Sequence, residues 1–388
     1  MNCRHCNKKL ENSFVDLGFQ PPSNSYLTFE DLKKSEIYYP LRVCYCTNCW
    51  LVQTEDYALR TEFFSSDYAY FSSTSKTWLK HAQIYVEMIT NKLNLSKDSF
   101  VIEIASNDGY LLKNFVSKNI PCLGIEPTEN TAAASEALGI PVIKKFFGND
   151  LVNTILNKGK ADLIIGNNVF AHVPDINDFT SAIYKILKTN GVLNLEFPYF
   201  GNLINDTQFD TIYHEHYSYL SLTSVNSIFL KNGLKIIDIE FIKTHGGSIR
   251  VYGALINSNL KVSDNVSLLL KKEISQGFTK NKFYQTFQDK VDIIKNDLLE
   301  FLIKASKENK TVVGFGAAAK GNTLLNYCGI KSDLIKFIVD SAESKQNKFM
   351  PGSHIPIYSP EKLNDFIPDY ILILPWNLKE EIMDLNNH

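Results

Sequence analysis

The chain has 388 residues, of which 44% are hydrophobic, enough for a globular core in two or three domains. Its 40 Lys and Arg against 42 Asp and Glu give a net charge of −2, which argues against a protein that coats nucleic acid or an acidic membrane. No stretch reaches the ~20 apolar residues of a membrane helix. The polar first residues also lack an apolar signal core, so the sequence predicts a soluble, cytoplasmic protein with no nucleic-acid or membrane partner.

Cysteines are concentrated near the N-terminus in two CxxC turns, Cys3 with Cys6 and Cys46 with Cys49. The odd total of 7 cysteines argues against a disulfide framework. Two CxxC turns together complete a tetrahedral zinc site that leaves no open position for catalysis. The sequence therefore predicts a structural zinc held by these four residues. Cys44 is an alternative ligand, and metal-free reduced thiols or a redox CxxC stay open.

A strand, a turn of small residues and a helix follow a helical pattern at 78–94. The strand is expected at 100–104, and the turn at 105–109 reads ASNDG. The next strand ends in GIEP, where the carboxylate of Glu126 can accept ribose hydroxyls. This is the first βαβ unit of a doubly wound sheet. Its single glycine favours a nucleoside without a pyrophosphate, such as S-adenosylmethionine, over NAD, which stays an alternative.

Two further strands are expected in ADLIIGNNVFAHVPD and GVLNLEFPYF. Asn167, Asn168 and His172 follow the first of them, at the position where open α/β sheets bind ligands. His172 either faces this site or is a packed residue at the start of a helix.

The segment TIYHEHYSYL at 211–220 gathers proton-handling side chains. In an extended segment, one side would carry Tyr213, Glu215 and Tyr217 and the other His214 and His216, although a turn would change this. Histidine is the natural base because its pKa lies near neutrality.

Other interpretations of this segment are weaker. An HExxH metal motif fails because Ser218 stands at the position of its second histidine. No GxSxG elbow supports a hydrolase. A loop of packed tyrosines and solvated histidines stays open.

The C-terminal third begins with long helices at 259–309. KTVVGFGAAAKGNTLLNY then predicts a strand, a glycine turn and a helix, with Asp340 at the end of the next strand. This is a second Rossmann-like unit, and on its own the pattern is also that of an NAD site.

The order of these motifs resembles the sugar C-methyltransferases, S-adenosylmethionine-dependent enzymes that methylate a carbon of nucleotide-linked 4-ketosugars. The resemblance rests on the four-cysteine module and on VIEIASNDGYLL, GIEP, NNVFAHVPD, YHEHYSYLS, THGGSIRVY and GFGAAAKGNTLLNYCGI, and it covers nearly the whole chain. The family turn reads EIGSNDG, so Ala105 stands in place of its first glycine. We expect this alanine to be tolerated if its φ is negative.

The resemblance implies an α/β protein in three parts. These are a zinc-binding module at 1–60, a class I methyltransferase (Rossmann-like) domain at 61–255, and a C-terminal helical linker and Rossmann-like domain at 256–388 that binds the nucleotide sugar. The S-adenosylmethionine site would comprise Glu103, Ala105, Asn107, Asp108, Gly109, Glu126, Phe147 and Asn167.

The resemblance also implies roles in catalysis and substrate binding. His216 would remove the proton from the sugar carbon, Glu215 would hold a sugar hydroxyl or orient an imidazole, and Tyr213 and His172 would donate to the enolate oxygen. Lys320 and Asn322 lie near a helix N-terminus, where a diphosphate is favourable. The substrate contacts would comprise Tyr68, Tyr70, His245, Ser248, Arg250, Lys320 and Asn322.

The implied reaction is methylation at C3 of a dTDP-linked 4-keto-deoxysugar, for branched deoxysugar biosynthesis by a monomer or weak homo-oligomer. Methylation at C5 of a similar ketosugar and an NAD-linked nucleotide-sugar oxidoreductase stay open as other enzymes. A non-catalytic zinc scaffold is the non-enzymatic alternative, and it predicts that neither the methyl donor nor a nucleotide sugar binds.

Overall fold

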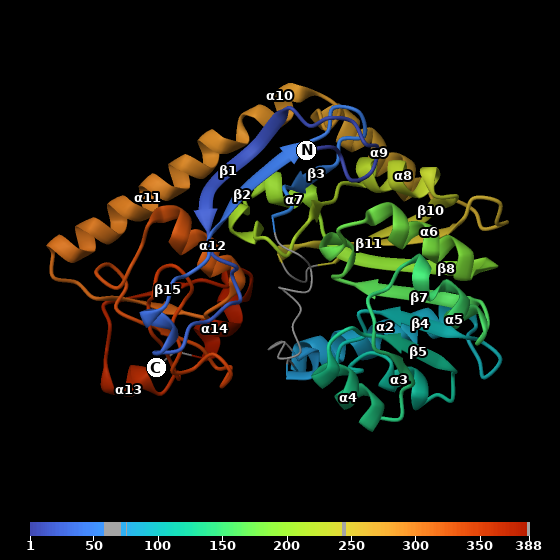
Figure 1. The fold of residues 1–388 in the computed structure, drawn as a ribbon, viewed down its shortest axis with the longest axis horizontal. Coiled ribbons are helices and arrows are strands. Elements are labelled where there is room, and N and C mark those ends of the chain that lie inside the picture. The colour runs from blue at the N-terminus through green and yellow to red at the C-terminus, as the bar shows by residue number, and fades with distance from the viewer. Residues whose placement is uncertain (58–70, 75, 243–245, 386–388) are drawn as a thin grey trace.

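The computed structural model describes residues 1–57, 71–74, 76–242 and 246–385, which form three β-sheets (Figure 1). The first sheet is antiparallel, with the order β1-β2-β3-β9. Its strands are β1 (Asn12–Gln20), β2 (Tyr39–Tyr45), β3 (Val52–Thr54) and β9 (Ser218–Tyr219). The last strand comes from far along the chain, so the N-terminal sheet is completed by the segment that follows the histidines.

The second sheet has seven strands in the order β10-β11-β8-β7-β4-β5-β6. The strands from β4 to β8 are parallel, and β10 and β11 are antiparallel. The strands are β4 (Val101–Ile104), β5 (Cys122–Ile125), β6 (Val142–Ile143), β7 (Ala161–Asn167), β8 (Leu187–Pro198), β10 (Leu234–Ile242) and β11 (Ser248–Leu255). The parallel strands bring the turns after β4, β5, β7 and β8 to one edge, where doubly wound sheets bind ligands.

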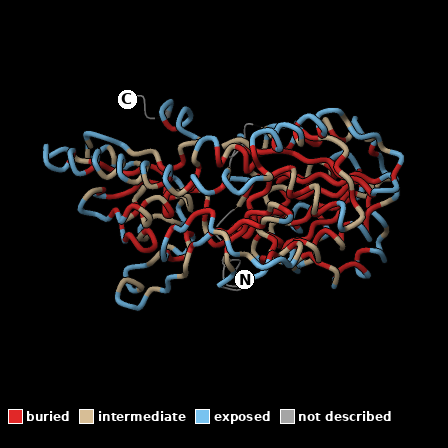
Figure 2. Tube along the Cα trace, turned by 90° about the horizontal axis from the view of Figure 1, so that it is seen from above, coloured by how far each residue is buried: buried red, intermediate tan, exposed pale blue. Residues whose placement is uncertain are grey.

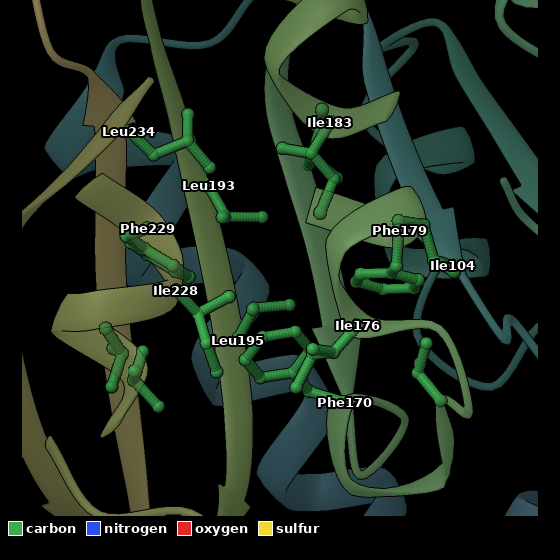
Figure 3. Close-up of a cluster of buried hydrophobic side chains, with 14 of the residues drawn as sticks. Ile104, Phe170, Ile176, Phe179, Ile183, Leu193, Leu195, Ile228, Phe229 and Leu234 are labelled. Atoms are coloured by element: carbon green, nitrogen blue, oxygen red, sulfur yellow. The ribbon is translucent and has the colours of Figure 1, made fainter. Parts of the chain in front are cut away.

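Helices cover both faces of this sheet (Figure 1). They are α2 (Lys76–Leu93), α3 (Lys113–Val116), α4 (Glu129–Ala137), α5 (Val152–Leu156), α6 (Ile176–Ile186) and α8 (Leu222–Lys231). The helix α7 (Phe200–Asn205) packs against the N-terminal sheet instead. In α6, apolar residues recur at helical spacing, and Ile176, Phe179 and Ile183 face Leu193 and other strand residues in the core (Figure 3).

The third sheet is parallel, with the order β14-β13-β12-β15. Its strands are β12 (Val312–Phe315), β13 (Ile338–Val339), β14 (Ile357–Tyr358) and β15 (Tyr370–Ile373). The helices that follow β11 in the chain are α9 (Asp264–Gln276), α10 (Asn281–Gln285), α11 (Phe287–Lys307), α12 (Ala319–Cys328), α13 (Lys362–Asp365) and α14 (Lys379–Leu385).

The N-terminal sheet packs against both other parts. Phe14 of β1 stacks on Phe287 of α11, with ring centroids 4.4 Å apart, and contacts Phe200 of α7 at 5.5 Å. The loop between β1 and β2 crosses to the third sheet, where Leu27 pairs with Phe349. Buried residues follow the strands, and exposed residues lie on the outer helices and loops (Figure 2).

The predicted α/β fold and both strand–turn–helix units are confirmed. β8 is longer than predicted, because it begins at Leu187 rather than at Gly191. Within the described residues, no helix is both long and apolar enough to cross a bilayer.

Candidate active site

The 105–109 turn after β4 contains three residues in the left-handed region. φ is +58° at Ala105, +50° at Asn107 and +78° at Gly109. The condition of a negative φ at Ala105 is therefore not met. The chain has to turn sharply here, because the amides of Ala105 and Ser106 both donate to the carbonyl of Ile125, at 2.8 and 3.2 Å. A non-glycine residue in this region costs about 1–2 kcal/mol, so the turn is strained at Ala105.

Glu126 braces this turn. One of its carboxylate oxygens accepts the Asn107 amide at 2.9 Å, and the other accepts the Thr128 amide at 3.0 Å. The Thr128 hydroxyl also donates to this second oxygen, so a ligand would have to use the remaining lone pair of the oxygen that accepts Asn107.

Three acidic side chains gather around the turn. Glu103, Asp108 and Glu126 are 0%, 4% and 5% exposed. Burial raises the pKa of Glu103 well above its ordinary value, and a hydrogen bond with Tyr110 opposes that rise. One Asp108 oxygen accepts the Ser73 amide at 3.0 Å. These acidic surroundings suit a ligand that carries positive charge.

The other two predicted donor-site residues lie on neighbouring elements. Asn167, the last residue of β7, donates its side-chain amide to the Tyr110 hydroxyl at 3.2 Å. Phe147 packs edge-on against Phe179, with ring centroids 5.2 Å apart, and is 8% exposed. Most of the Phe147 ring is thus part of the core, and only its remainder is accessible to a ligand.

Residues 213–216, here called the histidine turn, form a tight turn rather than an extended segment. The His216 amide donates to the Tyr213 carbonyl at 2.9 Å, which closes the turn. As a result Tyr213 and His216 lie together, with ring centroids 4.0 Å apart. The alternation expected of an extended segment is absent for this physical reason. Leu220, four residues after the turn, bridges to Tyr199, just after the carboxyl end of β8.

Hydrogen bonds define the protonation of His216. Its Nδ1 lies 2.8 Å from the carbonyl oxygen of Thr211, which can only accept, so Nδ1 carries a hydrogen. In the neutral ring Nε2 is then the acceptor, and the Tyr213 hydroxyl donates to it at 2.9 Å. The basic nitrogen of His216 is thus directed to the tyrosine.

His172 lies beside this pair, at the end of the loop that follows β7. Its ring is 4.6 Å from that of His216 between centroids, and its Nδ1 donates to the Glu215 carbonyl at 2.8 Å. Burial lowers the pKa of His172 to about 4, so the ring is neutral near pH 7 and its Nε2 has no hydrogen to donate. The predicted role of His172 as donor to an enolate oxygen does not fit this tautomer.

The Glu215 side chain is buried next to the N-terminal module. It is 4% exposed, and one of its oxygens accepts the side-chain amide of Asn24 at 2.6 Å. Burial raises the pKa of Glu215 to about 7, and the hydrogen bond from Asn24 opposes that rise.

All three parts of the chain hold the backbone around the histidine turn. Thr54 of the N-terminal module donates its hydroxyl to the His216 carbonyl at 3.1 Å. Thr323 of α12 donates to the Ile212 carbonyl at 2.8 Å. With the contact from His172, these bonds hold the turn to all three parts of the chain.

The C-terminal domain brings Lys320 close to the segment before the histidine turn. The Lys320 ammonium lies 4.6 Å from the Trp376 ring and donates to Asn377 at 2.6 Å. The Trp376 indole donates to Asp210 at 2.7 Å. Burial lowers the pKa of Lys320 and raises that of Asp210 to about 6.

Asn322 lies one turn into α12 and is fully buried. Both polar atoms of its side chain lack a hydrogen-bond partner within the described residues. Unsatisfied buried amides are rare, and ligand-binding sites are one place where they occur.

Two other predicted substrate residues lie in the seven-stranded sheet. Ser248 begins β11 and is fully buried. The Arg250 guanidinium pairs with Glu196 and Glu240, each at 2.9 Å, and is 4% exposed. These two ion pairs already neutralise the positive charge of Arg250, which weakens its prediction as a diphosphate contact. Three other predicted residues lie outside the described residues: Tyr68, Tyr70 and His245.

The four predicted zinc ligands form one cluster. The Sγ atoms of Cys3, Cys6, Cys46 and Cys49 lie within 4.8 Å of one another. A tetrahedral zinc with Zn–S bonds of about 2.3 Å places its sulfurs a little under 4 Å apart, so these thiols fit zinc. Cys44 is outside the cluster found among the described residues.

The sequence did not reveal Asn24, Asp210 or Trp376 as site residues. Asn24 follows the Pro21-Pro22 pair, which indicates a loop but not where that loop reaches. Asp210 and Trp376 are 166 residues apart in the chain, and no local pattern pairs them.

Comparisons with known proteins agree with this layout. Three family models match the chain: a zinc binding domain at 3–64, a methyltransferase domain at 80–239 and a C-methyltransferase C-terminal domain at 243–388. The C-methyltransferase NovU of Streptomyces niveus is 33% identical over 383 residues, which cover 98% of this chain and 91% of the relative.

Solved structures match less of the chain. A S-adenosylmethionine-dependent methyltransferase from Clostridium acetobutylicum is 14% identical, with a TM-score of 0.38, and the match covers 46% of this chain and 92% of that one. Magnesium protoporphyrin IX methyltransferase from Synechocystis is 15% identical, with a TM-score of 0.36, over 45% of this chain and 81% of that one.

Proposed function

The chain belongs to the C-methyltransferase family, and from that premise we propose that it methylates C3 of a dTDP-linked 4-keto-deoxysugar with S-adenosylmethionine as methyl donor. The single observation that carries the proposal is the histidine turn. It places an imidazole with a defined basic nitrogen, a phenol and a buried carboxyl at the carboxyl edge of a doubly wound sheet.

His216 is the base that removes the proton next to the ketone. Because Nδ1 is fixed on the Thr211 carbonyl, Nε2 is the nitrogen that receives the proton. The Tyr213 hydroxyl has to turn away from Nε2 first. The same rotation frees its hydrogen for the enolate oxygen, so we assign the enolate contact to Tyr213 rather than to His172.

The residues of the 105–109 turn suit the methyl donor. Bound S-adenosylmethionine supplies an electrophilic methyl group on a sulfonium, so the transfer itself needs no metal. The acids Asp108 and Glu126 favour its positive charge, and the lone pair left on the Glu126 oxygen that accepts Asn107 is available to a ribose. Asn167 and Tyr110 form the neighbouring wall.

The N-terminus of α12 suits the diphosphate of the substrate. Lys320 is a cation in the first turn of this ten-residue helix, and Asn322 offers an amide with unmet hydrogen bonds. Both favour a phosphate group at the positive end of the helix dipole. The Lys320 side chain already contacts Trp376 and Asn377, so it would exchange or share these contacts on binding.

Two steps test the proposal. Calorimetric titration with S-adenosylhomocysteine and then with dTDP should show saturable binding at separate sites. Incubation with S-adenosylmethionine and a dTDP-4-keto-6-deoxysugar should then give a product whose NMR spectrum shows a methyl group on C3. A methyl group on C5 would move the reaction to that carbon, and a cofactor-dependent absorbance change without methylation would support the oxidoreductase.

Enolate formation can be separated from methyl transfer. With S-adenosylhomocysteine in place of the donor, deuterium from D₂O should enter C3 of the substrate, because the base acts before the transfer. The His216→Asn variant should lose this exchange. His214→Gln is the matched control, since the His214 ring contacts the Pro40 carbonyl and Tyr39 of the N-terminal module.

A further inference from the structure

The loop at 21–38 of the N-terminal module reaches away from the zinc cluster. It is fastened to the C-terminal domain at three points. The Tyr26 hydroxyl donates to the Ala317 carbonyl at 2.6 Å, Leu27 pairs with Phe349, and Glu36 accepts the Gly352 amide at 2.7 Å. Between the zinc module and these anchors, the loop passes the histidine turn.

Asn24 makes the contact at that point. Its side-chain amide donates to Glu215 at 2.6 Å, while the Asn24 side chain itself is exposed. Glu215 is 4% exposed, and Asn24 is the hydrogen-bond donor found for its carboxyl group among the described residues. A buried carboxylate is costly unless donors stabilise it, so one donor has a large effect here.

We propose that Asn24 is a positioning residue that orients the Glu215 carboxylate and keeps it ionised during the reaction. This inference rests on the proposed function, in which Glu215 belongs to the site of methylation. On this proposal the zinc module contributes to the reaction as well as to folding, because it carries the loop that supplies the Asn24 amide.

Burial moves the pKa of three neighbouring groups away from neutrality. The Tyr26 phenol feels the charges of Glu215 and Asp340, and burial raises its pKa above the ordinary value. Burial lowers the pKa of His172, whose ring holds the Glu215 backbone, and the pKa of His214. His216, the next residue, is the proposed base. Its titration has to be distinguished from that of Glu215 by comparing variants with and without the Glu215 carboxyl.

The sign of the effect follows from the hydrogen bond. Burial places the pKa of Glu215 near 7, and the Asn24 amide favours the ionised form. Loss of this amide raises that pKa further. In Asn24→Ala, we expect the acidic limb of the kcat profile to move about one pH unit upward, with about a fivefold loss of kcat at pH 7. Asn24→Asp should lose more, because two adjacent carboxyls then share one proton.

A stability cycle tests the contact without any substrate. The folded pKa of Glu215 lies above its unfolded value of 4.5, so its contribution to stability is present at low pH and is lost as pH rises toward 7. Asn24→Ala should extend this loss of Tm to higher pH, by about one unit. In a Glu215→Gln background the same substitution should leave the pH dependence unchanged. Ser25→Ala, an exposed neighbour, is the control.

The two experiments fail in different ways. If no ketosugar is methylated but the stability cycle shows coupling, the proposed function is wrong and the Asn24–Glu215 contact stands. If Asn24→Ala changes the pH dependence of Tm equally in both backgrounds, or leaves the kcat profile of an active enzyme in place, the positioning role is overturned.

Discussion

The two Rossmann-like turns of this chain share one plan and differ in charge. In each, the acid after the neighbouring strand accepts an amide from the turn: Glu126 holds Asn107 at 2.9 Å, and Asp340 holds Ala317 at 2.7 Å. The second oxygen of each carboxylate accepts the amide two residues further on, from Thr128 and Ala342. The acid at the strand end is thus a brace for the turn in both domains.

The side chains around the two turns differ in charge, and on that difference we propose a different ligand for each. The first turn is surrounded by the buried acids Glu103 and Asp108 and has Ala105 in the left-handed region. The second uses Gly316 at φ +85° and leads directly into α12 with Lys320 in its first turn. A cationic sulfonium suits the first turn, and a diphosphate suits the second. The comparison teaches that charge, rather than the strand–turn–helix pattern, indicates the ligand class.

The largest expected effect is the loss of kcat in His216→Ala, which separates the chemical step from ligand binding at the two turns. His216→Ala removes the proposed base and should lower kcat about 1000-fold, within the range for general bases. The dissociation constants of S-adenosylhomocysteine and dTDP should stay within a factor of two, because neither turn loses a contact. Single-turnover kinetics and calorimetry measure the two quantities. A parallel loss of affinity would mean that His216 supports the sites rather than the reaction.

Gly316 tests whether the second turn needs its glycine. A Cβ at this position would lie 2.5 Å from Cδ of Pro375, and φ is left-handed. Gly316→Ala should therefore lower the free energy of unfolding by about 2–4 kcal/mol, as measured by urea denaturation. Gly329→Ala is the matched control. Its φ is +68° with no atom within 4 Å, so only the backbone cost of about 1 kcal/mol applies.

Lys320→Met tests the charge difference between the turns by removing the cation of the second turn. The variant keeps an apolar stem against Trp376 but removes the charge, so the dTDP dissociation constant should rise about tenfold. S-adenosylhomocysteine binding should not change. An equal loss for both ligands would contradict the separation of the sites, and unchanged dTDP binding would remove Lys320 from the substrate site.

Ala105→Gly has the smallest expected effect, and it is stabilising. Glycine relieves a left-handed alanine that costs about 1–2 kcal/mol, and its greater freedom in the unfolded chain returns about 0.5–1 kcal/mol of that gain. The net gain of about 0.5–1 kcal/mol should appear as a higher Tm. Ala133→Gly, in the exposed face of α4, should shift Tm in the opposite direction.

Local patterns predicted the parts of this molecule that depend on neighbours in sequence. The CxxC spacing predicted the cysteine cluster, and the change from strand to helical periodicity predicted both Rossmann-like units. A helix face or a short chelate turn is determined by residues a few positions apart, so the sequence carries the signal directly.

Long-range contacts were beyond those patterns. The sequence alone does not predict the ion-pair partners of Arg250. Strand pairing in the sheet brings it to Glu196 and Glu240. The histidine turn has no glycine or proline to mark it, so the sequence left both an extended segment and a turn open, and the hydrogen bonds that hold its flanks come from distant residues. The φ of Ala105 could not be predicted from the sequence, because hydrogen bonds to the distant carbonyl of Ile125 impose it.

The pairing of β9 with β3 has a consequence for the order in which the nascent chain can fold. Thr54 bonds to the carbonyl of His216, 162 residues later, and β9 follows directly. At about 5–20 residues per second, a ribosome needs about 10–30 s to synthesise that interval. During this time the cysteines have already emerged while the fourth strand of their sheet does not yet exist. Early zinc capture would protect these thiols in the cell before the rest of the enzyme is made.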